Sequence, residues 1–252
     1  MSLPEYHPYG PARSQYAELF RPRDGAPPFP VAVVIHGGFW RAAYGRKLMQ
    51  DLCADLAARG WAAWNVEYRR LGRESGGGFP QTLEDVAAAV DHLPEVPAHH
   101  AGLLDLTRVV AIGHSAGGHL ATWLATRERP RVAVTAVVAQ AGVVDLRLAA
   151  ELGLSRGVVH DFLGAPPDAA PDRYAAASPA ERLPLGVPAL LVHGGRDDIV
   201  PPVMSERFAA AARAAGDDVE LVLRPGEDHF VHTDPSGGSW ADVVRWLVRF
   251  AA

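Results

Sequence analysis

Apolar runs alternate with amphipathic helical patterns along most of this chain, and this alternation is the feature that most limits its fold. Six runs are expected to form buried strands: Val31–His36, Trp61–Tyr68, Arg108–Ile112, Val132–Ala139, Ala189–His193 and Val219–Leu223. Five segments show helical periodicity: Tyr44–Arg59, Gln81–Leu93, Ala116–Arg127, Val203–Ala215 and Ser239–Ala252. Strands that alternate with helices favour βαβ units. The sequence therefore predicts an α/β fold, with a mostly parallel central sheet flanked by helices on both faces.

Residues 143–187 interrupt this rhythm. The segment is rich in Ala, Pro and Gly and contains only short helical patterns. We interpret it as a short, cap-like insertion over the sheet edge and the functional site rather than as a second domain. A length of 252 residues, 48% of them hydrophobic, suits one α/β domain. We therefore expect residues 1–252 to form a single domain.

Composition excludes several classes of partner. The formal net charge is −5, so no basic surface indicates nucleic acid. The longest apolar stretch, Val132 to Val144, is interrupted by Thr135 and Gln140 and is shorter than the roughly 20 residues that span a bilayer. The start, MSLPEYHPYG, lacks a basic segment followed by an apolar one. We expect no signal peptide, no membrane partner and a cytoplasmic protein, with a homodimer left open.

The segment Gly113-His114-Ser115-Ala116-Gly117 has the form G-x-S-x-G and stands between a predicted strand and a predicted helix. A serine hydroxyl becomes a good nucleophile only when a neighbouring base takes its proton. A sharp strand-to-helix turn of this form exposes the serine oxygen at the carboxyl end of the sheet. The alternative is an ordinary tight glycine turn, so Ser115 needs partners elsewhere in the chain.

The stretch HGGFW at residues 36–40 follows the first predicted strand. Acyl transfer needs donors for a developing oxyanion, and backbone N–H groups on such a loop can supply them. This pattern assigns the donors to Gly38, Phe39 and Ala116. His36 is expected to brace the loop. Trp40 either lines the pocket or fills the core, and we favour the pocket.

A carboxylate and a histidine follow the two last predicted strands. Asp197 fits the spacing H-G-x-x-D-x-x-V-P better than its neighbour Asp198. His229 follows a glycine turn that its rival His232 lacks. Together with Ser115, they give the chain order Ser, Asp, His that is typical of a nucleophile elbow. The sequence therefore predicts the triad Ser115, Asp197 and His229.

Metal chemistry is not expected. The chain has 11 histidines but one cysteine, Cys53, and no H-E-x-x-H motif. We therefore expect neither a metal ion nor another cofactor.

From about Val31 to its end, the chain resembles the α/β-hydrolase superfamily. The HGGFW loop is similar to the H-G-G-x-W loop of kynurenine formamidase-like and related small esterases. Further stretches resemble that small-esterase branch and the neighbouring prolyl-oligopeptidase-like esterases: YRR at 68–70, GHSAGGHLA at 113–121 and ASPAERLP at 177–184. The resemblance implies a sheet of about eight strands with one antiparallel strand near the N-terminal edge, for which Tyr16–Phe20 is the candidate.

The resemblance also implies a function. It indicates a serine hydrolase that cleaves small carboxylic esters or aryl formamides through an acyl-enzyme on Ser115. Its partner is a small-molecule ester or amide, for which we expect contacts from Trp40, His114 and Phe162. One alternative is an arylformamidase that hydrolyses N-formylkynurenine specifically. Another is a non-catalytic small-molecule-binding protein on the same fold.

Overall fold

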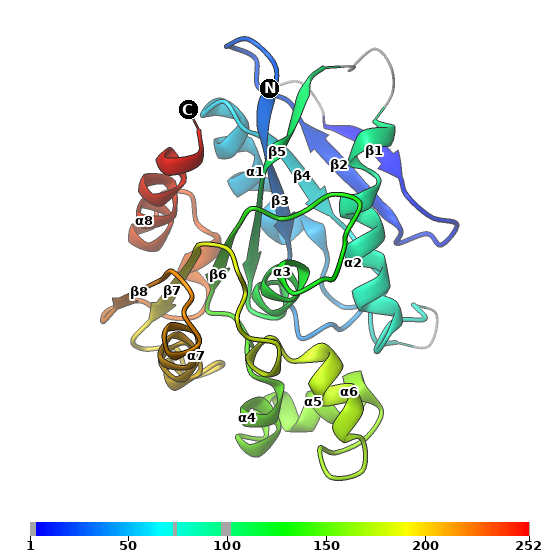
Figure 1. Ribbon diagram of the computed structural model, residues 1–252, viewed down its shortest axis with the longest axis vertical. Coiled ribbons are helices and arrows are strands. Elements are labelled where there is room, and N and C mark those ends of the chain that lie inside the picture. The colour runs from blue at the N-terminus through cyan, green and yellow to red at the C-terminus, as the bar shows by residue number, and fades with distance from the viewer. Residues whose placement is uncertain (1–3, 73–74, 97–101, 252) are drawn as a thin grey trace.

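A central sheet organises the computed structural model, which describes residues 4–72, 75–96 and 102–251. Within these residues the sheet has eight strands in the order β1-β2-β4-β3-β5-β6-β7-β8. The strands are β1 Glu5–Pro8, β2 Tyr16–Phe20, β3 Phe29–Ile35, β4 Ala62–Val66, β5 Leu104–His114, β6 Ala136–Gln140, β7 Ala189–Gly194 and β8 Val219–Arg224. Strand β2 runs antiparallel to both of its neighbours, and all other neighbouring pairs are parallel. The predicted mostly parallel sheet and the antiparallel strand Tyr16–Phe20 near its N-terminal edge are confirmed (Figure 1), but the edge itself is formed by β1, which was not expected.

The boundaries of two strands differ from the sequence prediction. Strand β5 begins at Leu104, four residues before the expected start, because leucines alternate with polar residues there and form no continuous apolar run. Strand β6 begins only at Ala136, although Val132 is buried. Side chains instead hold this residue, because Asp91 accepts from the Val132 N–H (3.0 Å) and Arg127 donates to its carbonyl (2.9 Å). Burial of Val132 is therefore not sufficient to make it part of strand β6.

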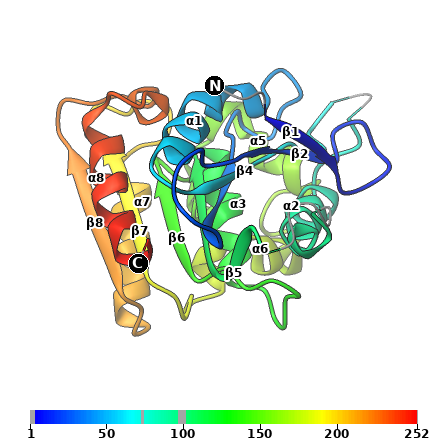
Figure 2. The same ribbon diagram turned by 90° about the horizontal axis from the view of Figure 1, so that it is seen from above.

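Helices cover both faces of the sheet. Alternate residues of β3 pack into two separate apolar clusters, Val31, Val33 and Ile35 in one and Ala32 and Val34 in the other. The first cluster contains side chains of α2 (Gln81–Asp91), α3 (Ala116–Ala125) and α7 (Val203–Ala214), and the second contains those of α1 (Gln50–Ala58) and α8 (Gly238–Leu247). Figure 2 shows α8 at the β7–β8 end of the sheet and α2 at the β1–β2 end.

The predicted insertion forms three short helices. They are α4 Leu146–Glu151, α5 Leu154–Leu163 and α6 Pro171–Ala177, followed by a 3-10 turn at Pro179–Glu181. They lie together at the lower end of the view in Figure 1. Their buried side chains join the same apolar cluster as α2 and α3, so residues 143–187 extend the core of that face.

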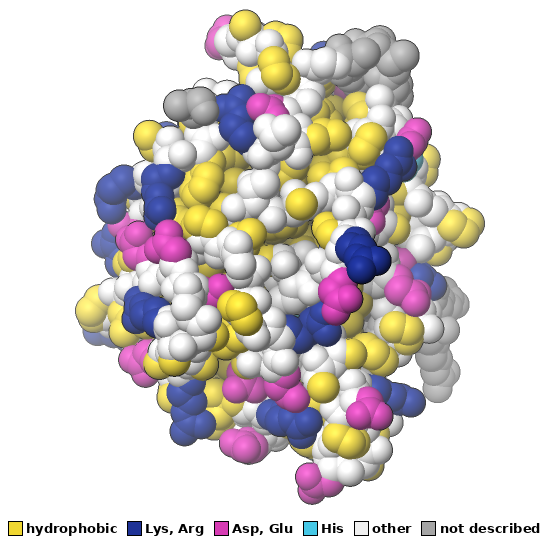
Figure 3. Space-filling view, viewed as in Figure 1, with side chains coloured by type: hydrophobic (Ala, Val, Ile, Leu, Met, Phe, Trp, Pro, Cys, Tyr) yellow, Lys and Arg dark blue, Asp and Glu magenta, His cyan; other side chains and the backbone are white. Residues whose placement is uncertain are grey.

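The surface seen in Figure 3 mixes basic and acidic side chains and shows no large region of a single sign. Within the described part of the chain, no helix combines the length and the apolar character that crossing a bilayer requires.

Candidate active site

Ser115 stands between the end of β5 and the start of α3 in a strained backbone conformation. Its φ is 56° and its ψ is −120°, a combination that non-glycine residues avoid. Three backbone hydrogen bonds hold it there: Ser115 N–H donates to Gln140 O (2.8 Å), and the N–H groups of His119 and Val143 each donate to Ser115 O (3.2 Å). Such strain persists only where the surroundings determine the geometry, and it is common at functional sites.

The glycines around Ser115 are required by close packing of the backbone. A Cβ on Gly113 would lie 2.0 Å from Gly117 O, and one on Gly117 would lie 2.1 Å from Ile35 O. A Cβ on Gly37 would lie 2.9 Å from the Cβ of Ser115. The G-x-S-x-G spacing and the first glycine of HGGFW therefore bring β3, its following loop and the serine turn together.

Ser115 faces a small cavity of about 120 Å³. Its lining residues are Gly38, Phe39, Tyr44, Leu48, His114, Ser115, Ile199, His229, Phe230 and Thr233. The serine is 1% exposed, and its Oγ has no hydrogen-bond partner among the described residues. A buried hydroxyl without a partner is unusual and is consistent with one reserved for a ligand or reaction.

Asp197 and His229 are brought together from the loops after β7 and β8. Asp197 Oδ2 lies 2.7 Å from His229 Nδ1. Asp197 Oδ1 accepts the backbone N–H groups of Ile199 (3.0 Å) and Val200 (2.8 Å). His193 Nε2 lies 3.3 Å from Oδ2. Four donors therefore converge on one buried carboxylate.

These contacts set the protonation of the pair. Burial alone would raise the pKa of Asp197, but hydrogen bonds from His193 and His229 outweigh it and hold that pKa well below the ordinary value. An ionised carboxylate only accepts, so His229 Nδ1 carries the proton that lies between them. In the tautomer that donates from Nδ1, His229 presents Nε2 as an acceptor to the cavity that Ser115 also lines.

Neither rival residue takes the place of Asp197 or His229. Asp198 is exposed to solvent, whereas its neighbour Asp197 is 5% exposed. His232 is fully buried, and neither of its ring nitrogens has a partner among the described residues. The structure therefore assembles Asp197 and His229, and not their rivals, beside Ser115.

Two of the three predicted oxyanion donors, Gly38 and Phe39, line the same cavity, and the third, Ala116, directly follows Ser115 in the chain. Gly38, Phe39 and Trp40 have φ values of 105°, 50° and 55°, so three successive residues turn in the left-handed region. The loop is fixed to Leu71, whose N–H donates to Trp40 O (2.6 Å). Ala116 is the first residue of α3, so its N–H has no acceptor within the helix. The loop after β3 and the start of α3 therefore both adjoin the Ser115 turn.

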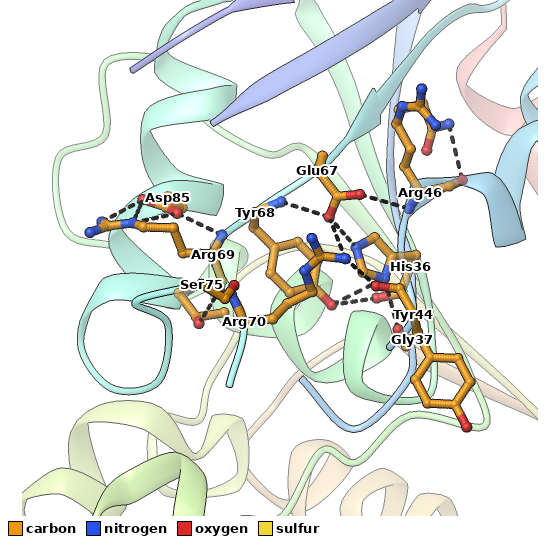
Figure 4. Close-up of polar contacts among 12 residues, drawn as sticks. His36, Gly37, Tyr44, Arg46, Glu67, Tyr68, Arg69, Arg70, Ser75 and Asp85 are labelled. Atoms are coloured by element: carbon orange, nitrogen blue, oxygen red, sulfur yellow. Dashed lines mark hydrogen bonds and ion pairs between the residues drawn. The ribbon is translucent and has the colours of Figure 1, made fainter. Parts of the chain in front are cut away.

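His36 braces this loop from beneath (Figure 4). Its Nε2 lies 2.9 Å from Glu67 Oε1, and its ring stacks on Tyr68 at 4.3 Å. Glu67 also pairs with Arg70 (3.2 Å). Burial raises the pKa of Glu67, but His36 and Arg70 oppose this and leave it below the ordinary value. The Glu67 carboxylate therefore links His36 to Arg70 and supports the loop.

Trp40 and Phe162 require a correction. Both side chains are buried, at 0% and 1% exposure, and their rings stack at 4.4 Å. Neither is among the residues that line the cavity, and no lining residue comes from 143–187. Trp40 Nε1–H instead donates to His119 Nδ1 (3.3 Å). These aromatic rings therefore join the loop to the insertion and do not contact a ligand in this cavity.

Some residues that line the cavity belong to no sequence motif and were not predicted to lie there. Tyr44 and Leu48 were assigned to an amphipathic helix, but α1 begins only at Gln50 after a 3-10 turn. Tyr44, Leu48 and Phe230 are 47%, 42% and 64% exposed at the cavity. His114 lines the cavity, as predicted, and its Nε2–H donates to His229 O (2.8 Å). Of Tyr44, Leu48 and Phe230, only Phe230 could have been placed near the site from the sequence, because it directly follows His229.

Three buried histidines are held neutral around this site. Burial lowers the pKa of His119 and of His232 from the ordinary value to about 4, and it lowers that of His114 well below the ordinary value. Despite these histidines, no group of three or more His, Cys, Asp or Glu side chains in residues 4–72, 75–96 and 102–251 could hold a metal ion.

The fold is expected to lose stability between pH 7 and pH 5. The unfolded chain binds protons at these histidines near pH 6.5, whereas the folded chain does not, so acid favours unfolding. We expect the free energy of unfolding to fall by ~2 kcal/mol for each of His119 and His232 over this interval. Guanidinium denaturation at both pH values measures this. A His232→Leu variant with the same pH dependence as the parent would contradict the assignment.

Comparisons with known proteins agree with this architecture. Esterase LipQ of Mycobacterium tuberculosis (strain ATCC 25618 / H37Rv) is 29% identical over 225 residues, which cover 83% of this chain and 52% of LipQ. Esterase LipC of the same organism is 27% identical over 244 residues, covering 88% and 58%. The chain thus spans little more than half the length of these curated relatives.

Solved structures with the same fold cover nearly the whole chain. Thermogutta terrifontis esterase 2 superposes with a TM-score of 0.80 at 24% identity, covering 100% of this chain and 97% of that one. A truncated carbohydrate esterase from gut microbiota gives 0.83 at 19% identity, covering 99% and 96%. At these identities the matches show the fold alone, and they confirm the α/β-hydrolase architecture.

Together, these relatives and solved structures support an α/β-hydrolase related to esterases. They do not single out the kynurenine formamidase-like branch that HGGFW resembles.

The family follows from a match to a family model. Residues 17–211, well over half of the chain, match the model of the BD-FAE family. The chain therefore belongs to the BD-FAE family.

Proposed function

We propose that this protein is a serine hydrolase that cleaves small carboxylic esters through an acyl-enzyme on Ser115. The observation that carries the proposal is the cavity itself. It is lined by an unpartnered serine hydroxyl, by a histidine whose far nitrogen is held by Asp197, and by the loop of Gly38 and Phe39. Nucleophile, base and oxyanion donors therefore meet around one small space.

The first half of the proposed reaction forms the acyl-enzyme. His229 Nε2 accepts the proton of Ser115 Oγ as the oxygen attacks the ester carbonyl. Asp197 stabilises the imidazolium through the 2.7 Å contact with Nδ1. The amides of Gly38, Phe39 and Ala116 donate to the oxyanion of the tetrahedral intermediate. His229 then gives its proton to the alcohol as it leaves.

The second half repeats these steps with water. His229 takes a proton from a water molecule, which attacks the acyl carbonyl, and the same amides hold the second oxyanion. The proton then returns to Ser115 Oγ, and the carboxylic acid leaves. The enzyme ends in its initial state, so no cofactor is needed in this scheme.

Two observations favour small esters. The cavity of about 120 Å³ matches a short acyl group in size. The two relatives above are named esterases, and the Thermogutta terrifontis enzyme is described as phosphoramylated by tabun. Because this chain spans only part of its curated relatives, their names support the reaction class and not a particular substrate.

Aryl formamides are the second candidate. The HGGFW loop supports them through its resemblance to formamidase-like enzymes. The exposed rings of Tyr44 and Phe230 at the cavity also offer surfaces on which an aromatic leaving group could stack. A formyl group is the smallest acyl group and would fit the same space.

The test compares kcat/KM for p-nitrophenyl acetate and N-formylkynurenine and follows labelling of the protein by a fluorophosphonate. We expect hydrolysis of the acetate and one phosphonyl group on Ser115, located by peptide mass spectrometry. A formamide that reacts faster by several orders of magnitude would identify the second candidate instead.

Absence of both hydrolysis and labelling would overturn the proposal and favour a binding protein on the hydrolase fold. Labelling of a different serine would also overturn it, because Ser115 is the one serine among the residues that line this cavity with His229.

A further inference from the structure

A second cavity adjoins the one at Ser115. Its volume is about 450 Å³, and three basic side chains line it, those of Arg46, Lys47 and Arg70. Tyr44 and Leu48 line both cavities and form the boundary between them. Tyr44 also packs against the oxyanion loop, since a Cβ on Gly38 would lie 2.3 Å from the Cβ of Tyr44. The second cavity therefore opens on the oxyanion side of Ser115.

Positive charge exceeds negative charge in this second cavity. Arg46 pairs with Glu18 (2.6 Å), and Arg70 pairs with Glu67 (3.2 Å). The Lys47 side chain is exposed, and its ammonium group makes no hydrogen bond or ion pair with any described residue. Three cations thus face two carboxylates, and the charge of Lys47 remains uncompensated.

Glu67 is already fully engaged and cannot neutralise Lys47. Its Oε1 lies 2.9 Å from His36 Nε2, and its Oε2 accepts the backbone N–H of Arg46 (3.1 Å). Figure 4 shows this carboxylate turned toward His36 and Arg46, while the ring of Tyr44 extends away from them. The carboxylate therefore serves the loop, and the cations retain capacity for a ligand.

The two arginines also keep unused donors. The Nε atoms of Arg46 and Arg70 are buried and have no acceptor among the described residues. A buried donor without an acceptor costs stability unless a ligand or water satisfies it. A carboxylate has two oxygens that accept from guanidinium and ammonium groups, so it matches this set of donors.

We propose that this second cavity binds a carboxylate carried by the ester substrate whose carbonyl lies at Ser115. The inference rests on the proposed ester hydrolysis and specifies its substrate class, an ester with one anionic arm. That arm crosses the apolar boundary of Tyr44 and Leu48 and ends at Lys47 and the two arginines. Lys47 is then a specificity residue and has no part in the chemical step.

The test uses two pairs of esters. The two esters within a pair differ only in whether they carry a negative charge. The first pair is 3-carboxyphenyl acetate and 3-carbamoylphenyl acetate, with the anion on the alcohol arm. The second is the 4-nitrophenyl monoester of adipic acid and its terminal amide, with the anion on the acyl arm. The readout is the ratio of kcat/KM for the anionic ester to that for the neutral ester within each pair.

We expect a ratio of about ten in one of the two pairs, which also identifies the arm that carries the anion. Lys47→Met should lower that ratio about fivefold or more, and added salt should lower it in the parent protein. Lys47 is suitable because its replacement breaks no described contact. It is also the only lysine in the sequence, so modification of lysine amines acts on the same side chain.

Arg245→Met is the matched control. It removes one positive charge from an exposed side chain of α8 that pairs with Asp242, outside both cavities. The control should keep the ratio of the parent. Ratios near one in both pairs, or equal ratios in parent and Lys47→Met, would overturn the anion site while ester hydrolysis stands. Failure to hydrolyse any ester would overturn the proposed function and this inference together.

Discussion

Replacement of Ser115 by alanine is expected to lower kcat/KM for the best ester about 10⁴- to 10⁶-fold, with the fold intact. The hydroxyl is the nucleophile in the proposed scheme, so no acyl-enzyme can form without it. Its Oγ has no hydrogen-bond partner among the described residues, so its removal leaves no group unsatisfied. The free energy of unfolding should therefore stay at the parental value or rise slightly. Initial rates and guanidinium denaturation measure the two effects.

Ser178 gives a matched control for this variant. It is equally buried, but its Oγ accepts the backbone N–H of Leu146 at the start of α4 (3.0 Å). Ser178→Ala should cost about 1 kcal/mol of stability and leave turnover within a few-fold of the parent. A Ser115→Ala protein that retains full turnover would remove the serine mechanism, whatever its stability.

The sequence predicted the parts of the molecule in which local chemistry and fold agree. The alternation of strands and helices gave the sheet, because each buried strand is a continuous apolar run. The G-x-S-x-G spacing gave the turn at Ser115, because Gly113 and Gly117 each stand against backbone atoms. The spacing H-G-x-x-D-x-x-V-P favours Asp197 over Asp198, and in the structure it is Asp197 that contacts His229 in the loop after β8.

The remaining features depend on contacts between distant segments. Leu48 has an apolar side chain at helical spacing, which favours a core position, yet it borders the cavity because the helix begins two residues later. Trp40 follows the oxyanion loop in sequence, but its ring turns inward to stack on Phe162, 122 residues away in the insertion. No local pattern reports such a partner, so neither position could be inferred from the chain alone.

Asp197→Asn is expected to lower kcat/KM about 10³- to 10⁴-fold, the loss typical of the equivalent change in serine proteases. The loss of activity follows from the positions of the hydrogen-bond donors around the Asp197 carboxylate. The N–H groups of Ile199 and Val200 both point at Oδ1 and would hold the amide oxygen of asparagine there. The amide NH₂ would then stand at the Oδ2 position, 2.7 Å from His229 Nδ1.

That arrangement would reverse the histidine tautomer. Because the NH₂ group donates, Nδ1 would have to accept, and the single ring proton would move to Nε2, which faces the cavity. His229 could no longer accept the proton of Ser115, although every side chain would remain in place. ¹⁵N chemical shifts of the His229 ring report the tautomer directly, alongside the rate.

The acid stability of the same variant provides a second readout. The pKa of Asp197 is lowered in the fold, so its ionised form stabilises the protein above the ordinary carboxyl pKa of about 3.9, and this contribution is lost as pH falls below that value. Asparagine removes this part of the pH dependence. Asp198→Asn, at the exposed neighbour, should change neither the rate nor the acid limb. If Asp198→Asn lost activity and Asp197→Asn did not, the carboxylate that orients His229 would be that of Asp198 and not that of Asp197.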